Sequence, residues 1–182
     1  KPRYFAYKAS ICAHERSQKQ GCNACIDVCS TLAIRADGDH VFVEPHLCMG
    51  CGACATVCPS GAMSYAYPSV PDLARILRTL ISTYAKAGGR DPCILLHAEE
   101  GRVAIAQAAR HGRGLPAHVI PLEVHHIVSV GLDVWLSALA HGAARVAVLV
   151  TGNEAPQYRM ALQRQMEIGD IIANALGYQG EH

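Results

Sequence analysis

Beyond residue 91, short apolar runs alternate with longer segments in which apolar residues recur at helical spacing. The apolar runs lie at residues 93–97, 117–122 and 145–150. Near-continuous runs of this length are typical of strands that are covered on both faces of a parallel sheet. The helical segments follow at about residues 101–110, 132–141 and 157–176. This alternation favours a small α/β domain built on a parallel sheet.

The N-terminal third of the chain is built from shorter elements, and the same order of loop, short helix and strand occurs twice. Residues 4–9 and 62–67 are rich in strand formers, and residues 24–30 predict a short helix after a loop. A hairpin is predicted at residues 33–44, since its central Asp-Gly pair favours the positive φ angles of a tight turn. A second loop and a second short helix then follow, ending near residue 58. The repetition indicates a pseudo-twofold pair of βαβ-like halves within an α+β domain.

One amphipathic helix is expected between these two parts. Leucine and isoleucine recur every three or four positions from Leu73 onward, and Gly88 and Gly89 end the segment. The chain thus divides into residues 1–67, a connecting helix in 68–91 and the α/β part in 92–182. Because a further strand would be natural after the last helix, we expect the α/β part to be truncated and the chain to be a fragment.

The candidate chemistry lies in the cysteines, which form two sets of four. The second set is Cys48, Cys51, Cys54 and Cys58, spaced C-x2-C-x2-C-x3-C and followed by proline. Three cysteines two residues apart let a tight loop wrap three corners of a cubane iron–sulfur cluster, and this run is a bacterial pattern for such clusters. The fourth cysteine lies a helical turn further on, so it points away from the loop and can reach a different cluster.

The other cluster then needs cysteines elsewhere, and the first set supplies them. It comprises Cys12, Cys22, Cys25 and Cys29, of which the last three keep the same spacing, while residues 13–21 form an insertion. The usual crossed pairing assigns Cys12, Cys22, Cys25 and Cys58 to one cluster and Cys48, Cys51, Cys54 and Cys29 to the other. Residues 1 to about 67 resemble a bacterial two-[4Fe–4S] ferredoxin, which implies a ferredoxin-like fold and electron transfer through two clusters.

Other uses of these cysteines remain open at this point. Paired C-x2-C motifs also bind zinc, although two interlocked sets of four suit cubane clusters better. Disulfide bonds are a further use, but cysteines packed two apart fit loops around a metal better than a secreted framework. If the insertion draws Cys12 away, the first cluster has three irons or a labile fourth iron.

A second resemblance covers residues of about 92–178 and rests on the run from Gly131 to Leu149. This run is similar to the small iron–sulfur (delta) subunit of methyl-viologen-reducing hydrogenases, which passes electrons between a hydrogenase or formate dehydrogenase and a flavin-containing partner. That family has cysteines at its strand ends for a [2Fe–2S] cluster. Here Thr151 to Glu154 follow the last strand, and Cys93 is the domain's single cysteine, so we expect no third cluster.

Composition and charge say more about the cellular compartment of the protein than about its function. The 182 residues carry a formal net charge of +1, so no bulk charge favours nucleic acid or a membrane surface. The longest apolar stretch, residues 127–150, is interrupted by Asp133, His141 and Arg145, so no membrane span is expected. The chain opens without an apolar signal segment, and oxygen-sensitive clusters on free thiolates indicate the cytoplasm.

The sequence therefore predicts a carrier of single electrons between redox partners, such as a dehydrogenase or hydrogenase, with no catalytic residue of its own. Two alternatives remain for the α/β part: a flavin- or ligand-binding module in the electron-input subunit of a larger oxidoreductase, or an anchor to a larger complex. Ligand-type side chains at the predicted strand ends are candidates for such a site, although surface loops often carry them without binding anything. They are His97, Glu123, His125, His126 and Glu154.

Overall fold

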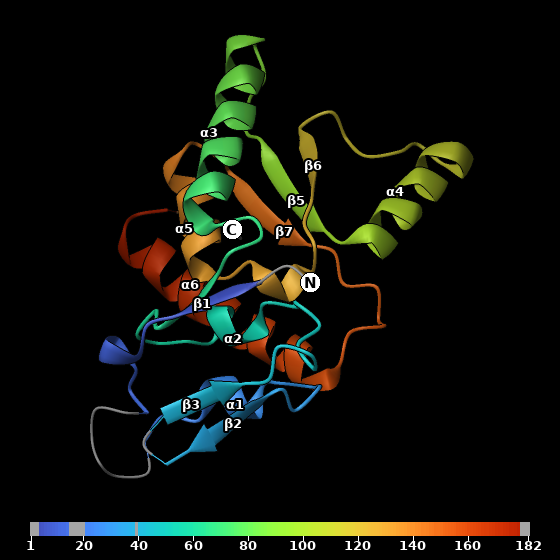
Figure 1. Cartoon of the computed structure of the whole chain (residues 1–182). Helices are drawn as coiled ribbons and strands as arrows, with labels where there is room; N and C mark the ends of the chain where they lie inside the picture. The colour runs from blue at the N-terminus through green and yellow to red at the C-terminus, as the bar shows by residue number, and fades with distance from the viewer. Residues whose placement is uncertain (1–3, 15–20, 39, 179–182) are drawn as a thin grey trace.

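The computed structural model describes residues 4–14, 21–38 and 40–178, which form two antiparallel strand pairs and one three-stranded parallel sheet (Figure 1). The first pair joins β1 (Phe5–Tyr7) to β4 (Met63–Tyr65), so the start and the end of the N-terminal part lie side by side. The second pair is the predicted hairpin of β2 (Ile34–Asp37) and β3 (His40–Val43).

Two one-turn helices follow the cysteine loops. They are α1 (Ala24–Asp27) and α2 (Ala53–Thr56), and α1 is shorter than the helix predicted over residues 24–30. A 3-10 turn, η1 (Ala9–Ile11), leads into the first loop. Helices of four residues have almost no stability of their own, so their geometry depends on packing and on whatever the loops bind.

The predicted connecting helix is α3 (Val70–Lys86), and its apolar face is part of a core. Ser69 caps its first turn by accepting a hydrogen bond from the Asp72 amide at 3.4 Å. Leu73, Leu77 and Ile81 are buried, and the helix packs on α5 (Leu132–Ala140). The helix therefore contributes to the packed interior as well as joining two segments of chain.

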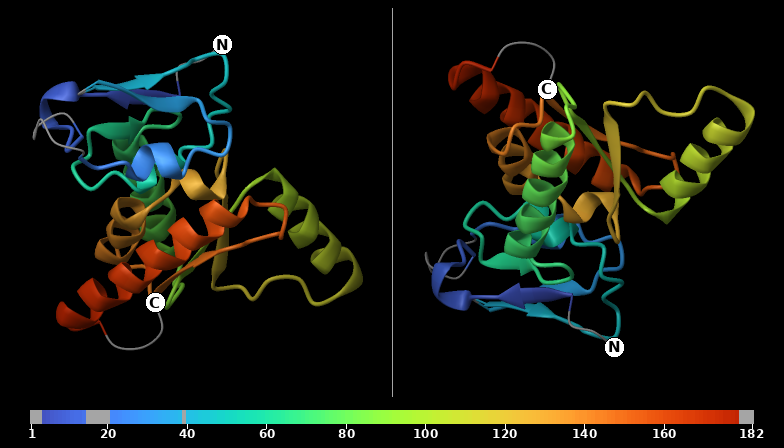
Figure 2. Two further views of the ribbon diagram at one scale, coloured as in Figure 1. Left: turned by 90° about the horizontal axis from the view of Figure 1, so that it is seen from below. Right: turned by 90° about the horizontal axis from the view of Figure 1, so that it is seen from above.

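The parallel sheet has the order β6–β5–β7, with β5 (Cys93–His97) between β6 (Val119–Glu123) and β7 (Arg145–Val148). Helices α3, α5 and α6 (Pro156–Ala175) gather on one face of this sheet (Figure 2). Ile94 and Leu96 of the central strand are almost completely buried beneath them. The parallel α/β part predicted from the apolar runs is thus present.

The opposite face of the sheet is less covered than the sequence predicted. Helix α4 (Glu99–His111) extends away from the sheet, and its contact is concentrated at Gly101, which lies against His97 and Leu149 (Figure 2). Most of the helix is alanine or polar, and Val103 is half exposed. A helix with so little large apolar surface gains little free energy from lying flat on a sheet.

The described residues form two hydrophobic clusters: one lies within the N-terminal part, and the other joins the N-terminal part to the α/β part. Val28 and Ala53, next to the cysteines, belong to the same buried cluster as Leu77 of α3 and Val128 of η2 (Ile127–Ser129). The Thr56 hydroxyl of α2 donates to the Val128 carbonyl at 2.6 Å. Within the residues described, no helix is long and apolar enough to cross a membrane.

Candidate metal centres

Two small cavities lie in the N-terminal part, and each is lined by four cysteines. Cys12, Cys22, Cys25 and Cys58 line the first cavity. Cys29, Cys48, Cys51 and Cys54 line the second cavity. Each cavity combines three cysteines of one loop with one cysteine of the other, the same grouping as the crossed pairing predicted from the sequence. That these sulfurs bind iron remains a prediction.

The two short helices explain how the chain crosses from one cavity to the other. Cys25 and Cys54 are each the second residue of a one-turn helix, and Cys29 and Cys58 each follow the helix end. The Cys29 amide donates to the Ile26 carbonyl and the Cys58 amide to the Ala55 carbonyl, both at 3.2 Å. Because α1 and α2 pack against each other, the last cysteine of each loop is carried to the neighbouring cavity.

The chemistry of this donor set fits iron–sulfur clusters. None of the nine cysteines forms a disulfide bond. Burial raises the pKa of Cys25 and of Cys54 to about 12, and neighbouring cysteines add to the effect. Buried thiols in groups of four therefore need a strong positive charge to become thiolates, and iron bound by soft sulfur ligands supplies it. Within the described parts of the chain, no three ligand-type side chains converge closely enough to hold a single metal ion.

Hydrogen-bond donors approach several of these sulfurs. The Met63 amide donates to the Cys58 sulfur at 3.3 Å. The Tyr158 hydroxyl, from the first turn of α6, donates to the Cys51 sulfur at 3.2 Å. Donors of this kind offset the negative charge of a thiolate-bound cluster and raise its reduction potential. The contact from α6 had no signal in the sequence, because 107 positions separate its two residues.

The insertion in the first loop leaves Cys12 in the first cavity. The His14 ring is buried, and its Nδ1 lies 3.1 Å from the Cys22 carbonyl oxygen. A Cβ on Gly21 would lie 2.6 Å from the Ala13 carbonyl oxygen, so the two ends of the insertion meet closely. Residues 15–20 of the insertion lie outside the described residues. Cys12, which follows η1, is buried beside Cys25 despite the added chain.

The second loop meets the α/β part at a point where only glycine fits. Gly52 has a φ of +80°, and a Cβ there would lie 2.6 Å from the Ser129 Cα. We expect Gly52→Ala to lower the stability of the protein by about 2 kcal/mol or more, since the left-handed conformation alone costs about 1–2 kcal/mol for an L-residue and Ser129 must also move. Thermal denaturation of the anaerobic protein measures this loss.

Gly88 provides the matched control for this prediction. It has a φ of +88°, and nothing lies within 4 Å of a Cβ built there. Gly88→Ala therefore imposes the cost of the left-handed conformation without a steric clash. If the two variants lose equal amounts of stability, the close contact between Gly52 and Ser129 is contradicted.

The polar residues at the strand ends do not gather into a site. Glu123 pairs with Arg102 at 3.1 Å, and His125 stacks on Tyr4 with ring centroids 5.4 Å apart. The carboxylate of Glu154 accepts hydrogen bonds from backbone amides of its own loop. His97 lies 2.9 Å from the Ala98 carbonyl through Nδ1, and His126 accepts a hydrogen bond from the Val128 amide at 3.2 Å. These candidates have structural partners instead.

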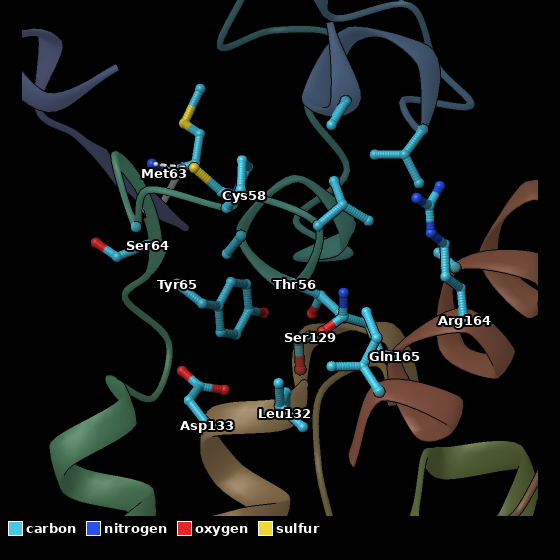
Figure 3. A pocket seen from close by; sticks show the side chains of 18 of the residues that line it. Thr56, Cys58, Met63, Ser64, Tyr65, Ser129, Leu132, Asp133, Arg164 and Gln165 are labelled. Atoms are coloured by element: carbon cyan, nitrogen blue, oxygen red, sulfur yellow. Dashed lines mark hydrogen bonds between the residues drawn. The ribbon is translucent and has the colours of Figure 1, made fainter. Parts of the chain in front are cut away.

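A third and larger cavity, of about 960 Å³, opens where α1, α2 and β4 face α5 and α6 (Figure 3). Thr56, Tyr65, Ser129 and Asp133 line it, and Cys58 stands on its wall. The sequence did not predict this cavity, because its walls come from segments that are far apart along the chain.

Comparison with known proteins agrees with the two cysteine-lined cavities. The family model of the 4Fe–4S dicluster domain matches residues 20–62, which include every cysteine of the two sets except Cys12. The N-terminal part is therefore a 4Fe–4S dicluster domain of the ferredoxin type, a kind of domain that carries [4Fe–4S] clusters and transfers electrons.

Several curated proteins are similar to this part of the chain. "Ferredoxin 7Fe" of Hydrogenibacillus schlegelii is 38% identical over 40 residues, 22% of this chain and 51% of that protein. "Ferredoxin" of Alicyclobacillus acidocaldarius subsp. acidocaldarius is 38% identical over 48 residues, 26% of this chain and 60% of its own length. "Putative electron transport protein YsaA" of Escherichia coli (strain K12) is 46% identical over 39 residues, 21% of this chain and 25% of that protein.

The match thus spans between a quarter and three fifths of the length of these relatives. No solved structure is significantly similar to the chain. The family model covers part of the ferredoxin domain and does not reach the α/β part.

Proposed function

We propose that the protein carries single electrons between two partner proteins through one cluster on Cys12, Cys22, Cys25 and Cys58 and another on Cys29, Cys48, Cys51 and Cys54. The observation that carries this proposal is the pair of cavities, each lined by four cysteines drawn from both loops. The clusters supply the redox chemistry, while the chain binds them, excludes water and sets their potentials.

The α/β part, residues 92–182, serves in this proposal as a docking domain for a dehydrogenase or hydrogenase type of partner. Its support is the resemblance of the run from Gly131 to Leu149 to the delta subunit of methyl-viologen-reducing hydrogenases, and its close packing against the second cysteine loop. With Cys93 as its single cysteine, the domain is expected to hold no cluster of its own.

The first test is the content of iron and acid-labile sulfide in anaerobically purified protein, together with the EPR spectrum of the dithionite-reduced sample. We expect about eight of each per chain and signals from two interacting cubanes. Zinc in place of iron would overturn the electron-transfer function. About seven irons would indicate a three-iron first cluster, in which Cys12 is not a ligand; one relative is named a 7Fe ferredoxin.

A second candidate function is favoured by the third cavity. Its volume of about 960 Å³ is of the size that small-molecule and cofactor sites have, roughly 300–1,000 Å³. In this alternative the protein is the electron-input subunit of a larger oxidoreductase and binds a flavin or another ligand beside Cys58. Flavin released from the purified protein by acid and detected by its fluorescence would favour it, and cluster absorbance alone would leave the carrier function.

A further inference from the structure

Tyr158 connects the α/β part to a predicted cluster ligand. Its side chain is 3% exposed, and its hydroxyl lies 3.2 Å from the sulfur of Cys51. The ring packs edge-on against His126, with the centroids 5.3 Å apart and the planes at 83°. The hydroxyl also contacts the Ser30 hydroxyl and lies 3.8 Å from the Met49 sulfur. A tyrosine held on this many sides has little freedom to turn its hydroxyl away from Cys51.

The direction of these hydrogen bonds follows from the charge on a cluster ligand. A cysteine bound to iron is a thiolate, so its sulfur has no proton to donate. The Tyr158 hydroxyl must then be the donor to Cys51. Since that hydroxyl has only one proton, the Ser30 hydroxyl donates to the tyrosine oxygen. The three groups form a chain of donors that ends on the sulfur, in which each bond polarises the next.

We propose that Tyr158 raises the reduction potential of the second cluster by donating a hydrogen bond from its hydroxyl to the sulfur of Cys51. An added electron increases the negative charge on the cluster sulfurs, so a fixed donor stabilises the reduced cluster more than the oxidised one. This inference rests on the proposed assignment of Cys51 to the second cluster. Tyr158 acts on the second cluster through the ligand Cys51. Because Tyr158 belongs to α6, the reduction potential of this cluster then depends on how α6 is packed.

The test is a redox titration of the Tyr158→Phe holoprotein in which EPR measures the reduced clusters at each potential. Phenylalanine keeps the buried ring and its packing on His126 and removes only the hydroxyl. We expect one of the two cluster reductions to shift, with the ratio of reduced to oxidised cluster at a fixed potential falling at least tenfold. For a one-electron couple this shift is about 59 mV toward more negative potential. The other cluster should keep its potential.

Tyr84→Phe is the matched control. Its hydroxyl donates to the Arg90 carbonyl at 3.2 Å near the end of α3, so this variant loses a tyrosine hydroxyl that has no contact with a cysteine. Both potentials should equal those of the unchanged protein. A Tyr158→Phe protein with about eight irons and unchanged potentials would overturn the role of Tyr158 and leave the electron-carrier function intact.

Iron analysis separates a failure of this inference from a failure of the proposed function. Zinc, or no iron, in the unchanged protein would overturn the cluster assignment itself. If Tyr158→Phe does not retain its second cluster, Ser30→Ala decides the question, because it keeps the tyrosine and removes the group that polarises it. A smaller shift in the same direction would support the proposal, and no shift would overturn it.

Discussion

Replacing Cys58 with serine is expected to remove the cluster of the first loop, although Cys58 follows Cys54 in the sequence. The sulfur of Cys58 lines the cavity of Cys12, Cys22 and Cys25, and a cubane that loses one of its four thiolates is no longer fully held. The iron content should fall from about eight to about four per chain. EPR of the reduced protein should then show a single cubane without coupling to a neighbour.

The companion variants make this a test of the crossed pairing. The cluster that remains in Cys58→Ser should have the same spectrum and potential as the one in Cys25→Ser. Likewise, Cys29→Ser should match Cys54→Ser, because these two cysteines line the second cavity. If Cys58→Ser instead matches Cys54→Ser, each loop holds its own cluster and the crossed assignment is wrong.

Leu77→Ala is expected to destabilise the whole protein by about 2–5 kcal/mol, the usual loss when a large buried side chain is truncated in a close-packed core. Leu77 is 0% exposed and lies in the core that also contains Val28 and Ala53 beside the cysteines. Chemical denaturation of the anaerobic protein should show cluster absorbance and helical circular dichroism being lost together, at a lower denaturant concentration than in the unchanged protein.

Ile76→Ala is the control for this prediction. Ile76 is the preceding residue of the same helix and is 42% exposed, so its truncation should cost less than about 1 kcal/mol. A helix that only connected two independent domains would make the two variants equivalent. Cluster loss at a clearly different denaturant concentration from helix loss would also contradict a shared core.

Local sequence patterns were sufficient for most of the secondary structure. The strand predicted at residues 93–97 is β5, because five apolar or semi-apolar residues between turn-forming segments have few other stable arrangements in water. The hairpin was predicted from an Asp-Gly pair, and β2 and β3 flank it. These features depend on neighbours in the sequence, so they can be predicted without knowing the fold.

Features that depend on tertiary contacts were not predictable in the same way. The apolar face of α3 was evident in the sequence, but the sequence did not show that α5 covers it. Periodicity indicated α4, yet whether a helix lies on a sheet depends on how much apolar surface it offers, and α4 offers little. Ser129 and Tyr158 approach the second loop from positions far along the chain, and no spacing rule connects them to a cysteine.

The way in which Tyr158 is held bears on the rate of electron transfer as well as on the reduction potential. Its hydroxyl is fixed by Ser30, and its ring by His126, before any electron arrives. A dipole that is already oriented toward the site of new charge does not have to turn when that charge appears. If Cys51 binds the second cluster as proposed, its surroundings need little rearrangement at each step, and a rigidly packed α/β part would keep the barrier to electron exchange low there.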